Sequence, residues 1–429
     1  MIAKVKQLFK NDATLFFFSN LVYSFSTYLI ALLIPYKLNT EGLADFSAAF
    51  NIIILLIFVF EFGLSISYLR FNQIYKISDK INSALQILIF CLLIILSQTF
   101  LGTYTDVVFG TQSVGIEQEY IYLSIFALLT WIFFKNTMLA RKRIKFIVFN
   151  SFVILFARLA GLLYIFLNDM PIELNNIFLY LFVLPYLLVI VLNMKENIVI
   201  LAQNSTDFKN SRSWKIFFKR AKQFIAFSAL TYIINGLYVY TSRYAIVYLA
   251  DNEMKSILAE IGYALTFGGL ILIFIGSLRT YFISKFNISN TDEISKYIDM
   301  LLGYKIKFLL LGFVVSVLVS GLVYLIKPSY LTIDSVIYVF ILIYSSVIVA
   351  YLSLFTLLSK TFNFNKLELI LNIIRLSLVI VSVHLIFAKF PIIGFVIINL
   401  IIILVELYFA RTVVKRVLNK IELGKIDAK

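Results

Sequence analysis

The sequence predicts an all-α polytopic membrane protein with about twelve transmembrane helices, arranged in two six-helix lobes around a central cavity. Of its 429 residues, 61% are hydrophobic and only 14% are charged, which is too little charge to cover a soluble protein of this length. Apolar runs of about 20 residues recur along the whole chain. Such runs are helices in hydrocarbon, because each segment must satisfy its own backbone N–H and C=O groups. The period-two alternation of a membrane β-barrel is absent from the sequence.

Six candidate spans precede the longest loop of the N-terminal side, 194–221, and six follow it. This division predicts an N-lobe at 1–205 and a C-lobe, which includes a basic C-terminal tail, at 206–429. The candidate spans are 14–36, 44–69, 82–102, 119–139, 147–167, 176–193, 222–249, 258–283, 304–326, 333–358, 365–388 and 391–410.

The positive charges alternate with the predicted spans. Of the 38 lysines and arginines, 26 fall in segments on the side of the N-terminus and four in segments on the other side. By the positive-inside rule, both termini are expected in the cytoplasm. The net charge of +15 is therefore interpreted as a topology signal, and no nucleic-acid partner is expected. The single cysteine, Cys91, and the single histidine, His384, provide neither a disulfide framework nor a Cys/His metal site.

A weak internal repeat relates the two halves. A gap-free offset of 215 residues compares 20–72 with 235–287 and matches Asn20 with Asn235 and Tyr23 with Tyr238. The polar matches fall at corresponding ends of spans. This pattern predicts a parallel repeat, in which the halves are related by an axis along the membrane normal.

Several charges fall inside predicted spans, where a mid-bilayer charge costs about 2.5–3.5 kcal/mol on insertion scales. Arg158 and Arg375 lie near the middle of their spans, and Arg243 lies in the outer half of the seventh. Lys135 and Arg279 lie near cytoplasmic ends, where we expect them to snorkel. Glu61 is interpreted as the only carboxylate inside an apolar span, so a cationic excess remains.

Helical spacing gives several spans a polar face. The predicted cavity is cationic and suits an anionic passenger, because guanidinium groups bind phosphate in a bidentate way. Packing of each arginine against polar groups of neighbouring helices is the alternative, and it stays open. The passenger-binding candidates are Arg158, Arg243, Arg375, Lys135 and Arg279. The cavity-lining candidates are Asn20, Ser24, Asn235, Tyr240 and Asn372.

Glu61 has two candidate roles, and the sequence does not separate them. It either exchanges a coupling ion as the cavity opens, or it forms a fixed ion pair with an arginine. No cofactor, metal site or catalytic residue is expected. Coupling to protons or to sodium is left open.

The segment KLNTEGLADFSAAF, followed by FEFGLSISYLRF, resembles the first two helices of the polysaccharide (O-antigen, Wzx-type) flippases. These belong to the multidrug/oligosaccharidyl-lipid/polysaccharide exporter superfamily. TYIINGLYVYTSRYAIVYLA resembles their seventh helix, and PIIGFVIINLIIILVE resembles their last. The resemblance implies two lobes that alternate access to a cationic cavity. It also implies that Arg243 matches an arginine common in helix seven, with Ser242 where an acidic residue is common.

The passenger implied by this resemblance is a polysaccharide repeat unit on undecaprenyl diphosphate, turned from the inner to the outer leaflet. The expected location is the bacterial cytoplasmic (inner) membrane. Expected partners are the lipid bilayer, the lipid-linked oligosaccharide and other membrane proteins of polysaccharide assembly, with the chain itself a monomer. The alternatives are a drug or cation antiporter of the same superfamily, or a membrane enzyme such as a polymerase or acyltransferase. A transporter is favoured over an enzyme, because His384 lacks an acidic partner and the loops are short.

Overall fold

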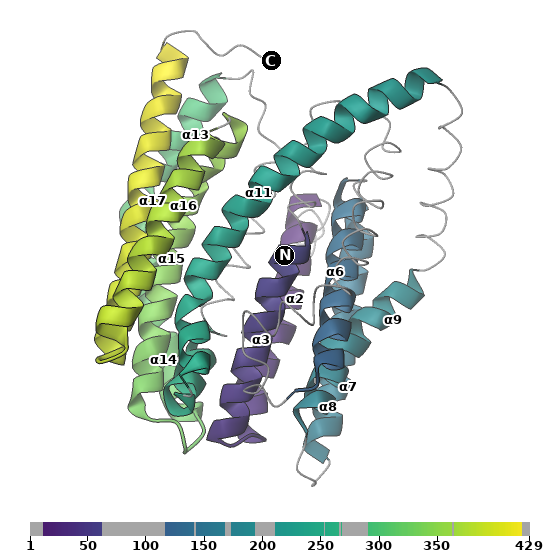
Figure 1. The fold of residues 1–429 in the computed structure, drawn as a ribbon, viewed down its shortest axis with the longest axis vertical. Coiled ribbons are helices and arrows are strands. Elements are labelled where there is room, and N and C mark those ends of the chain that lie inside the picture. The colour runs from purple at the N-terminus through teal and green to yellow at the C-terminus, as the bar shows by residue number, and fades with distance from the viewer. Residues whose placement is uncertain are drawn as a thin grey trace, which may run out of the picture. The chain divides into compact units, whose positions relative to one another are not determined.

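The computed structural model describes residues 12–61, 116–140, 143–167, 173–193, 211–252, 254–265, 267, 291–362 and 364–422. Within these residues the chain is helical and contains no strand, which confirms the predicted fold class (Figure 1). The first half contains α2 (Asp12–Leu33), η1 (Ile34–Tyr36), α3 (Thr40–Glu61), α6 (Gln118–Ala140), α7 (Ile144–Leu167), α8 (Leu174–Phe178), η2 (Leu179–Val183) and α9 (Leu184–Leu192). The second contains α11 (Ser211–Asp251), α13 (Thr291–Gly303), α14 (Lys305–Ile326), α15 (Ile333–Thr361), α16 (Asn365–Ser382), η4 (Val383–Phe387) and α17 (Pro391–Glu422).

Eight helical segments of the described residues are long and apolar enough to cross a membrane. Each of them overlaps a span predicted from the sequence. They are Phe18–Tyr36, Thr40–Ile57, Ile144–Leu167, Leu174–Leu192, Lys305–Ile326, Ile333–Thr356, Asn365–Phe387 and Pro391–Asn419. The predicted span 119–139 contains the shorter apolar helix Glu119–Ile132, and 222–249 lies within α11. The predicted span 82–102 lies outside the described residues, as does most of 258–283.

The described residues fall into two compact units. One contains those within 1–37 and 48–239, and the other contains those within 38–47 and 240–429. The predicted lobe boundary at 205/206 stays a prediction, as does the cavity between the lobes.

In the first unit, α2 packs along α7. The hydroxyl oxygens of Ser19 and Ser151 lie 2.8 Å apart across this interface, and the Ser19 hydroxyl also lies 3.3 Å from the Ile147 carbonyl oxygen. Small polar residues allow close approach of two helix backbones and supply hydrogen bonds where water is absent. This packing turns the polar side chains of α2 toward the other helices of the unit.

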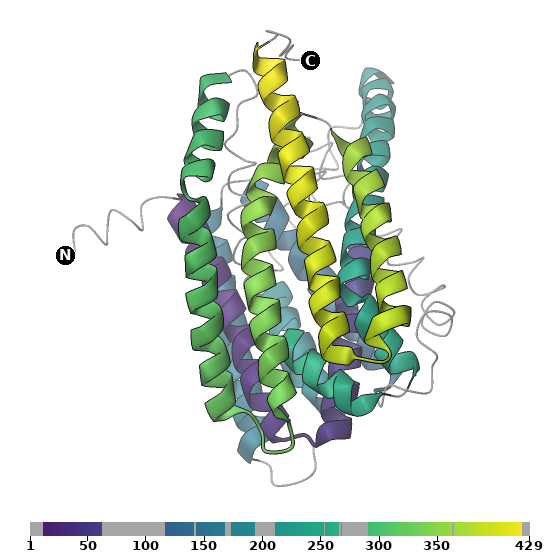
Figure 2. The same cartoon turned by 90° about the vertical axis from the view of Figure 1, so that its left-hand side faces the viewer.

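In the second unit, α15 is the central helix. It packs against α14 and α17, and α17 also packs against α16 (Figure 2). Within α15, 67% of the candidate span is buried, compared with 22% of the α14 span. The exposed side of α14 carries large apolar side chains such as Leu310, Phe313 and Leu318. Such a surface is suited to lipid rather than water.

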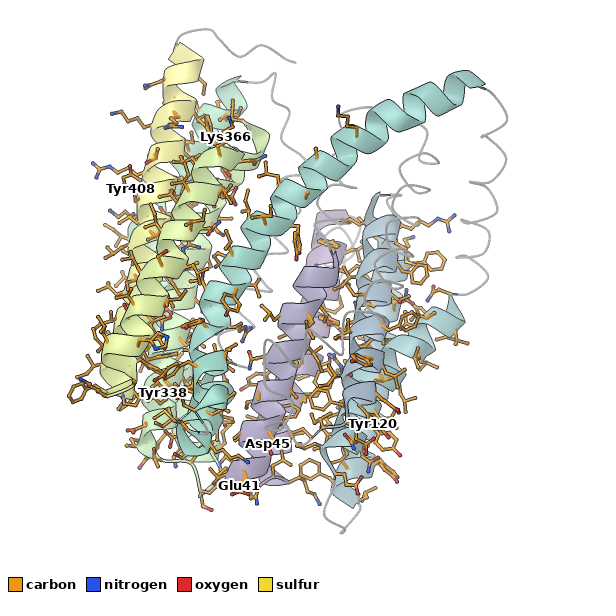
Figure 3. The ribbon with its side chains drawn as sticks, in the orientation of Figure 1. Glu41, Asp45, Tyr120, Tyr338, Lys366 and Tyr408 are labelled. Carbon is orange, nitrogen blue, oxygen red and sulfur yellow. The ribbon has the colours of Figure 1, made fainter. Side chains whose placement is uncertain are left out.

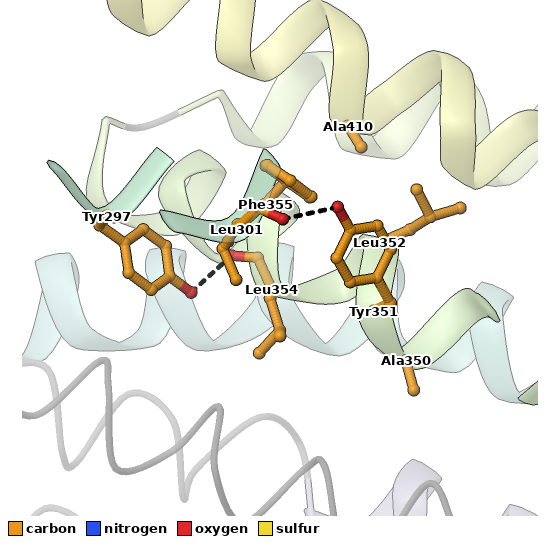
Figure 4. Packing of buried hydrophobic residues seen from close by; sticks show 8 residues of the cluster. All are labelled: Tyr297, Leu301, Ala350, Tyr351, Leu352, Leu354, Phe355 and Ala410. Atoms are coloured by element: carbon orange, nitrogen blue, oxygen red, sulfur yellow. Dashed lines mark hydrogen bonds between the residues drawn. The ribbon is translucent and has the colours of Figure 1, made fainter. Parts of the chain in front are cut away.

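The short helix α13 ties this bundle together at one end. Its Tyr297 hydroxyl donates a hydrogen bond to the Leu354 carbonyl of α15, at 3.1 Å. In return, the Tyr351 hydroxyl of α15 donates to the Leu301 carbonyl of α13, at 2.9 Å (Figure 4). Ala410 of α17 completes the buried cluster. The paired hydroxyls fix α13 against α15 without leaving a polar group unsatisfied.

Two glycines allow close contact with the wider turns η2 and η4, which are π-helical. A Cβ atom at Gly161 of α7 would lie 3.0 Å from the Tyr180 carbonyl oxygen of η2. A Cβ atom at Gly394 of α17 would lie 2.3 Å from Phe387 Cα of η4. Any larger residue at Gly394 would therefore push α17 away from η4.

The beginning of α3 belongs to the second unit, and Glu41 and Asp45 mark it in Figure 3. Asp45 Oδ1 lies 3.8 Å from Lys255 Nζ. A Cβ atom at Gly262 would lie 2.3 Å from Ser47 Cβ. The 215-residue offset pairs Ser47 with Gly262, so two residues that are equivalent in the predicted repeat contact each other. The repeat itself stays a prediction.

Candidate functional site

Two arginines lie deep inside the helical packing. Arg158 of α7 is 1% exposed and Arg375 of α16 is 2% exposed, and each lies near the middle of a candidate membrane span. A guanidinium group removed from water requires partners for its N–H groups. The two arginines find partners of different charge.

Among the described residues, the hydrogen-bond partners of Arg158 are all neutral oxygen atoms. Its Nη1 donates to Ser26 Oγ at 2.7 Å and to Thr27 Oγ1 at 2.8 Å, both on α2. Its Nη2 donates to the Tyr186 hydroxyl of α9 at 2.6 Å, and its Nε donates to the Leu181 carbonyl oxygen of η2 at 3.1 Å. Arg158 therefore joins three segments of the first unit.

The Leu181 carbonyl is available because of Pro185. In an α-helix this carbonyl would accept a hydrogen bond from the N–H group four residues later, but proline has none. The guanidinium of Arg158 takes the place of that donor. Gly161, which follows Arg158 by three residues on α7, allows the close approach of α7 to η2 that this bond needs.

Lys135 of α6 points toward α2. Its Nζ donates a hydrogen bond to Asn20 Oδ1 at 2.6 Å and lies 5.7 Å from the ring centres of both Phe16 and Tyr23. The expectation that Lys135 snorkels toward an aqueous surface was therefore wrong. The amide oxygen of Asn20 accepts a charge-assisted hydrogen bond from the ammonium group inside the bundle.

Tyr23 of α2 links the two cations. Its ring centre lies 5.3 Å from Arg158 Cζ, and its hydroxyl oxygen lies 2.6 Å from that of Tyr186. We call Asn20, Tyr23, Lys135, Arg158 and Tyr186 the Tyr23 cluster. Among the described residues, no carboxylate forms an ion pair with either cation of this cluster. The described interior of the first unit therefore holds two positive charges with neutral partners.

Arg375 has an acidic partner. Its Nη2 lies 2.5 Å from Glu406 Oε2 of α17, and Glu406 is 6% exposed. Thr356 of α15 donates a hydrogen bond to Glu406 Oε1 at 3.2 Å. The interpretation of Glu61 as the only carboxylate inside an apolar span was wrong, because Glu406 lies within the apolar run of the last span. The sequence signal was present in VIINLIIILVEL, where this glutamate interrupts the run.

Three other candidates lie on α16, α2 and α11. Asn372 is buried on α16 one turn before Arg375. Ser24 is buried and donates a hydrogen bond to the Asn20 carbonyl oxygen, within its own helix, at 2.7 Å. The ring of Tyr240 packs 5.7 Å from that of Tyr244 on α11, between centres.

Four candidates remain: two lie on α11, one is the last residue of α3, and one lies outside the described residues. Arg243 is half-buried on α11, and Asn235 also lies on this helix. Glu61 is the last residue of α3, so the choice between a coupling role and a fixed ion pair stays open. Arg279 lies outside the described residues.

The structure thus brings together Lys135, Arg158 and Asn20 in one cluster, and Arg375 with Asn372 on one helix. Passenger binding by these residues stays a prediction. Within the described parts of the chain, no group of three His, Cys, Asp or Glu side chains is placed to hold a metal ion.

Solved structures of transporters match this chain over nearly its whole length. The eukaryotic MATE transporter AtDTX14 aligns with a TM-score of 0.59 and 13% identity, covering 96% of this chain and 99% of that one. A mutant of the Vibrio cholerae MATE transporter VcmN aligns with a TM-score of 0.54 and 13% identity, covering 97% of both chains. A MOP superfamily transporter from Pyrococcus furiosus aligns with a TM-score of 0.52 and 14% identity, covering 98% of both.

No protein-family model and no curated protein matches the sequence. The chain therefore has the fold of polytopic membrane transporters. More particularly, it is similar to MATE transporters of the MOP superfamily, at identities that carry the fold alone.

Proposed function

We propose that the protein is a membrane transporter that turns an undecaprenyl-diphosphate-linked polysaccharide repeat unit from the inner to the outer leaflet by alternating access. The observation that carries this proposal is the Tyr23 cluster, in which the described hydrogen-bond partners of Arg158 and Lys135 are all neutral. Two cations inside the helical packing, with no ion-pair partner among the described residues, favour an anionic passenger over a cationic one. The similarity to MATE transporter structures supports transport.

Within the Tyr23 cluster, Lys135 is the better candidate for direct contact with a phosphate group. An arginine has five N–H donors, and four hydrogen bonds of Arg158 already engage described partners. An ammonium group has three donors, and among the described residues only Asn20 accepts from Lys135. Lys135 also retains partial exposure. Arg158 then contributes a fixed positive charge, and Lys135 contributes the hydrogen bonds.

A drug or cation antiporter is the second candidate. A structure of a multidrug resistance MATE family transporter aligns with a TM-score of 0.52, at 16% identity. The pairing of Arg375 with Glu406 also removes one of the arginines that made the predicted cavity cationic. This candidate requires a carboxylate that becomes available to a cation.

Reconstituted vesicles distinguish the two candidates. A polyprenyl diphosphate that carries a fluorescent oligosaccharide is placed in both leaflets, and an impermeant quencher reports the outer fraction over time. We expect the wild type to exchange the lipid between leaflets and Lys135→Gln to slow the exchange by about tenfold or more, since a hydrogen bond to a charged group contributes about 1.5–3 kcal/mol. Lys296→Gln is the control, because Lys296 is an exposed lysine on α13.

A second outcome of the same experiment would favour the antiporter. Wild-type vesicles that exchange the lipid no faster than protein-free vesicles, yet accumulate an organic cation under a pH gradient, would establish the antiporter and reject the flippase. Equal exchange rates for wild type and Lys135→Gln would reject the role of Lys135 alone.

A further inference from the structure

We propose that the junction between α13 and α14 binds an anionic phospholipid, with Lys305 and Lys307 at its phosphate group and the exposed apolar side of α14 along its acyl chains. One residue, Tyr304, separates the two helices. We call residues 300–307 the α13–α14 junction. The proposal is independent of the passenger, because it concerns the lipid around the protein.

The α13–α14 junction is exposed, but the chain on both sides of it is packed. Six consecutive residues, 302–307, are exposed, whereas a helix that lies against a bundle buries one side of each turn. Leu301 just before them and Phe308 just after them belong to one cluster against α15. The Tyr304 N–H donates to the Met300 carbonyl oxygen at 3.2 Å, and the Phe308 N–H donates to the Tyr304 carbonyl oxygen at 3.0 Å. The exposed segment is therefore held in place at both ends.

The length of α14 places the junction at the level of the lipid headgroups. At about 1.5 Å per residue, the 22 residues of α14 extend over about 33 Å, close to the roughly 30 Å of a bilayer's hydrocarbon core. Lys305 is the first residue of α14 and Lys307 is the third. Their ammonium groups lie where the acyl chains that cover the exposed side of α14 meet their headgroups.

Exposed apolar side chains on both sides of the lysines favour a membrane surface over water. Met300 and Leu302 are exposed on α13, and Ile306 is exposed between the two lysines. If the junction stood in water above the membrane, these side chains would form an apolar patch there. At a membrane surface they bury their apolar atoms while the lysines reach the phosphate groups, as in amphipathic surface helices. Tyr304 is a residue type typical of this interface.

The charges of the junction are available to a phosphate group. Among the described residues, no carboxylate forms an ion pair with Lys305 or Lys307, and this includes Asp299, which is exposed on α13. Lys307 Nζ lies 5.0 Å from the centre of the Tyr304 ring. An aromatic ring attracts a cation without neutralising it, so Tyr304 positions Lys307 and leaves its charge in place. Each basic residue near the surface adds to the attraction of an anionic lipid, so two lysines favour an anionic over a zwitterionic headgroup.

Native mass spectrometry of the purified full-length protein in detergent measures this binding. The protein is titrated with phosphatidylglycerol, which is anionic, and with phosphatidylcholine, which is zwitterionic. We expect the wild type to bind phosphatidylglycerol more tightly. The double variant Lys305→Gln/Lys307→Gln should weaken that binding by about tenfold or more. Lys296→Gln/Lys415→Gln is the control, because it removes the same charge from exposed lysines of α13 and α17 and should bind like the wild type.

The ring of Tyr304 provides a second comparison at unchanged charge. Tyr304→Leu removes the ring that positions Lys307, and we expect it to weaken phosphatidylglycerol binding severalfold. Tyr304→Phe keeps the ring and should bind like the wild type. These two variants decide the question if Lys305→Gln/Lys307→Gln does not fold.

Three results would overturn the proposal. The first is equal affinity of the wild type for the two lipids. The second is an equal effect of the junction variant and the control variant, which would show that the total charge attracts the lipid. The third is a polyprenyl phosphate that binds more tightly than phosphatidylglycerol and loses this advantage in Lys305→Gln/Lys307→Gln, which would assign the junction to a carrier lipid. None of these results depends on the exchange assay that tests the flippase.

Discussion

A guanidinium group that leaves water needs hydrogen-bond acceptors, and the described acceptors of the two deep arginines differ in charge. Arg158 uses two hydroxyls of α2, one of α9 and a carbonyl that Pro185 leaves free. Arg375 uses a carboxylate. Positive charge is therefore retained around Arg158 and compensated at Arg375. This difference, rather than the number of arginines, determines where an anion is attracted.

A lysine side chain should not be able to replace the planar guanidinium group of Arg158. In Arg158→Lys, a single ammonium group cannot reach Ser26, Thr27, Tyr186 and Leu181 together. An unsatisfied buried acceptor costs about 1–3 kcal/mol, so we expect a clear fall in the unfolding temperature in detergent. Circular dichroism during heating measures it. Arg411→Lys changes an exposed arginine on α17; this variant is the control and should unfold at the same temperature as the wild type. If Arg158→Lys also unfolded at the wild-type temperature, the assigned hydrogen bonds of Arg158 would be contradicted.

For individual residues, the sequence identified buried charges but did not identify their partners. Arg158 and Arg375 were recognised because a charge inside an apolar run is visible in one dimension. Their partners were not, because hydroxyls such as Thr356 and Tyr186 have no signature until helices are packed. Glu406 was overlooked although it interrupts an apolar run of the predicted last span. The sequence showed no acidic partner for His384, and it also contained no sign of the tyrosine contact, in which His384 Nε2 lies 3.0 Å from the Tyr244 hydroxyl oxygen.

At the scale of elements, the positions of helices were predicted well and their contacts were not. Span bounds follow from composition alone, because lipid requires about 20 apolar residues per helix. The π-helical turns η2 and η4 are not visible in the composition, and each lies against a glycine of a neighbouring helix. Lys135 illustrates the same limit, since hydropathy gives its depth along α6 but does not show that Asn20 faces it.

The contact of α17 with η4 should be sensitive to a single methyl group. In Gly394→Ala the added Cβ would collide with the backbone of Phe387, which cannot rotate away, so we expect a loss of about 1–3 kcal/mol in stability. Gly321→Ala on α14 is the matched change, because no atom lies within 4 Å of its added Cβ. That variant should be neutral or slightly stabilised, by up to about 1 kcal/mol. Chemical unfolding in detergent compares the two, and equal effects would argue against close packing at Gly394.

For the whole molecule, the fold class and the transporter-like architecture could be anticipated from the sequence. The helical membrane fold is confirmed, and structures of MATE transporters match almost the full chain. The identity of the passenger could not be settled in this way. At 13% identity a shared fold does not determine which side chains line a path, and these side chains decide which charge can pass.

The topology predicted from the charges can be measured on intact cells. In a Cys91→Ser background, Lys389→Cys places a single thiol on an exposed residue just before α17. In a second variant, Lys415→Cys places a single thiol on an exposed residue toward the other end of α17. The positive-inside rule predicts that an impermeant maleimide labels position 389 in intact cells, and position 415 only after the membrane is opened. Labelling in the reverse order would place the end of α17 that carries position 415 outside the cell.

The ion pair between α16 and α17 also bears on how the chain enters the membrane during synthesis. Arg375 alone adds about 2.5–3.5 kcal/mol to the free energy of inserting α16 into the membrane. Glu406 adds a similar cost to the insertion of α17. Only Ala388, Lys389 and Phe390 separate η4 from α17, so the two helices can emerge and pair as one hairpin. We expect the insertion machinery to retain α16 until α17 has been made. In a chain that is truncated before Glu406, α16 would then stay outside the bilayer.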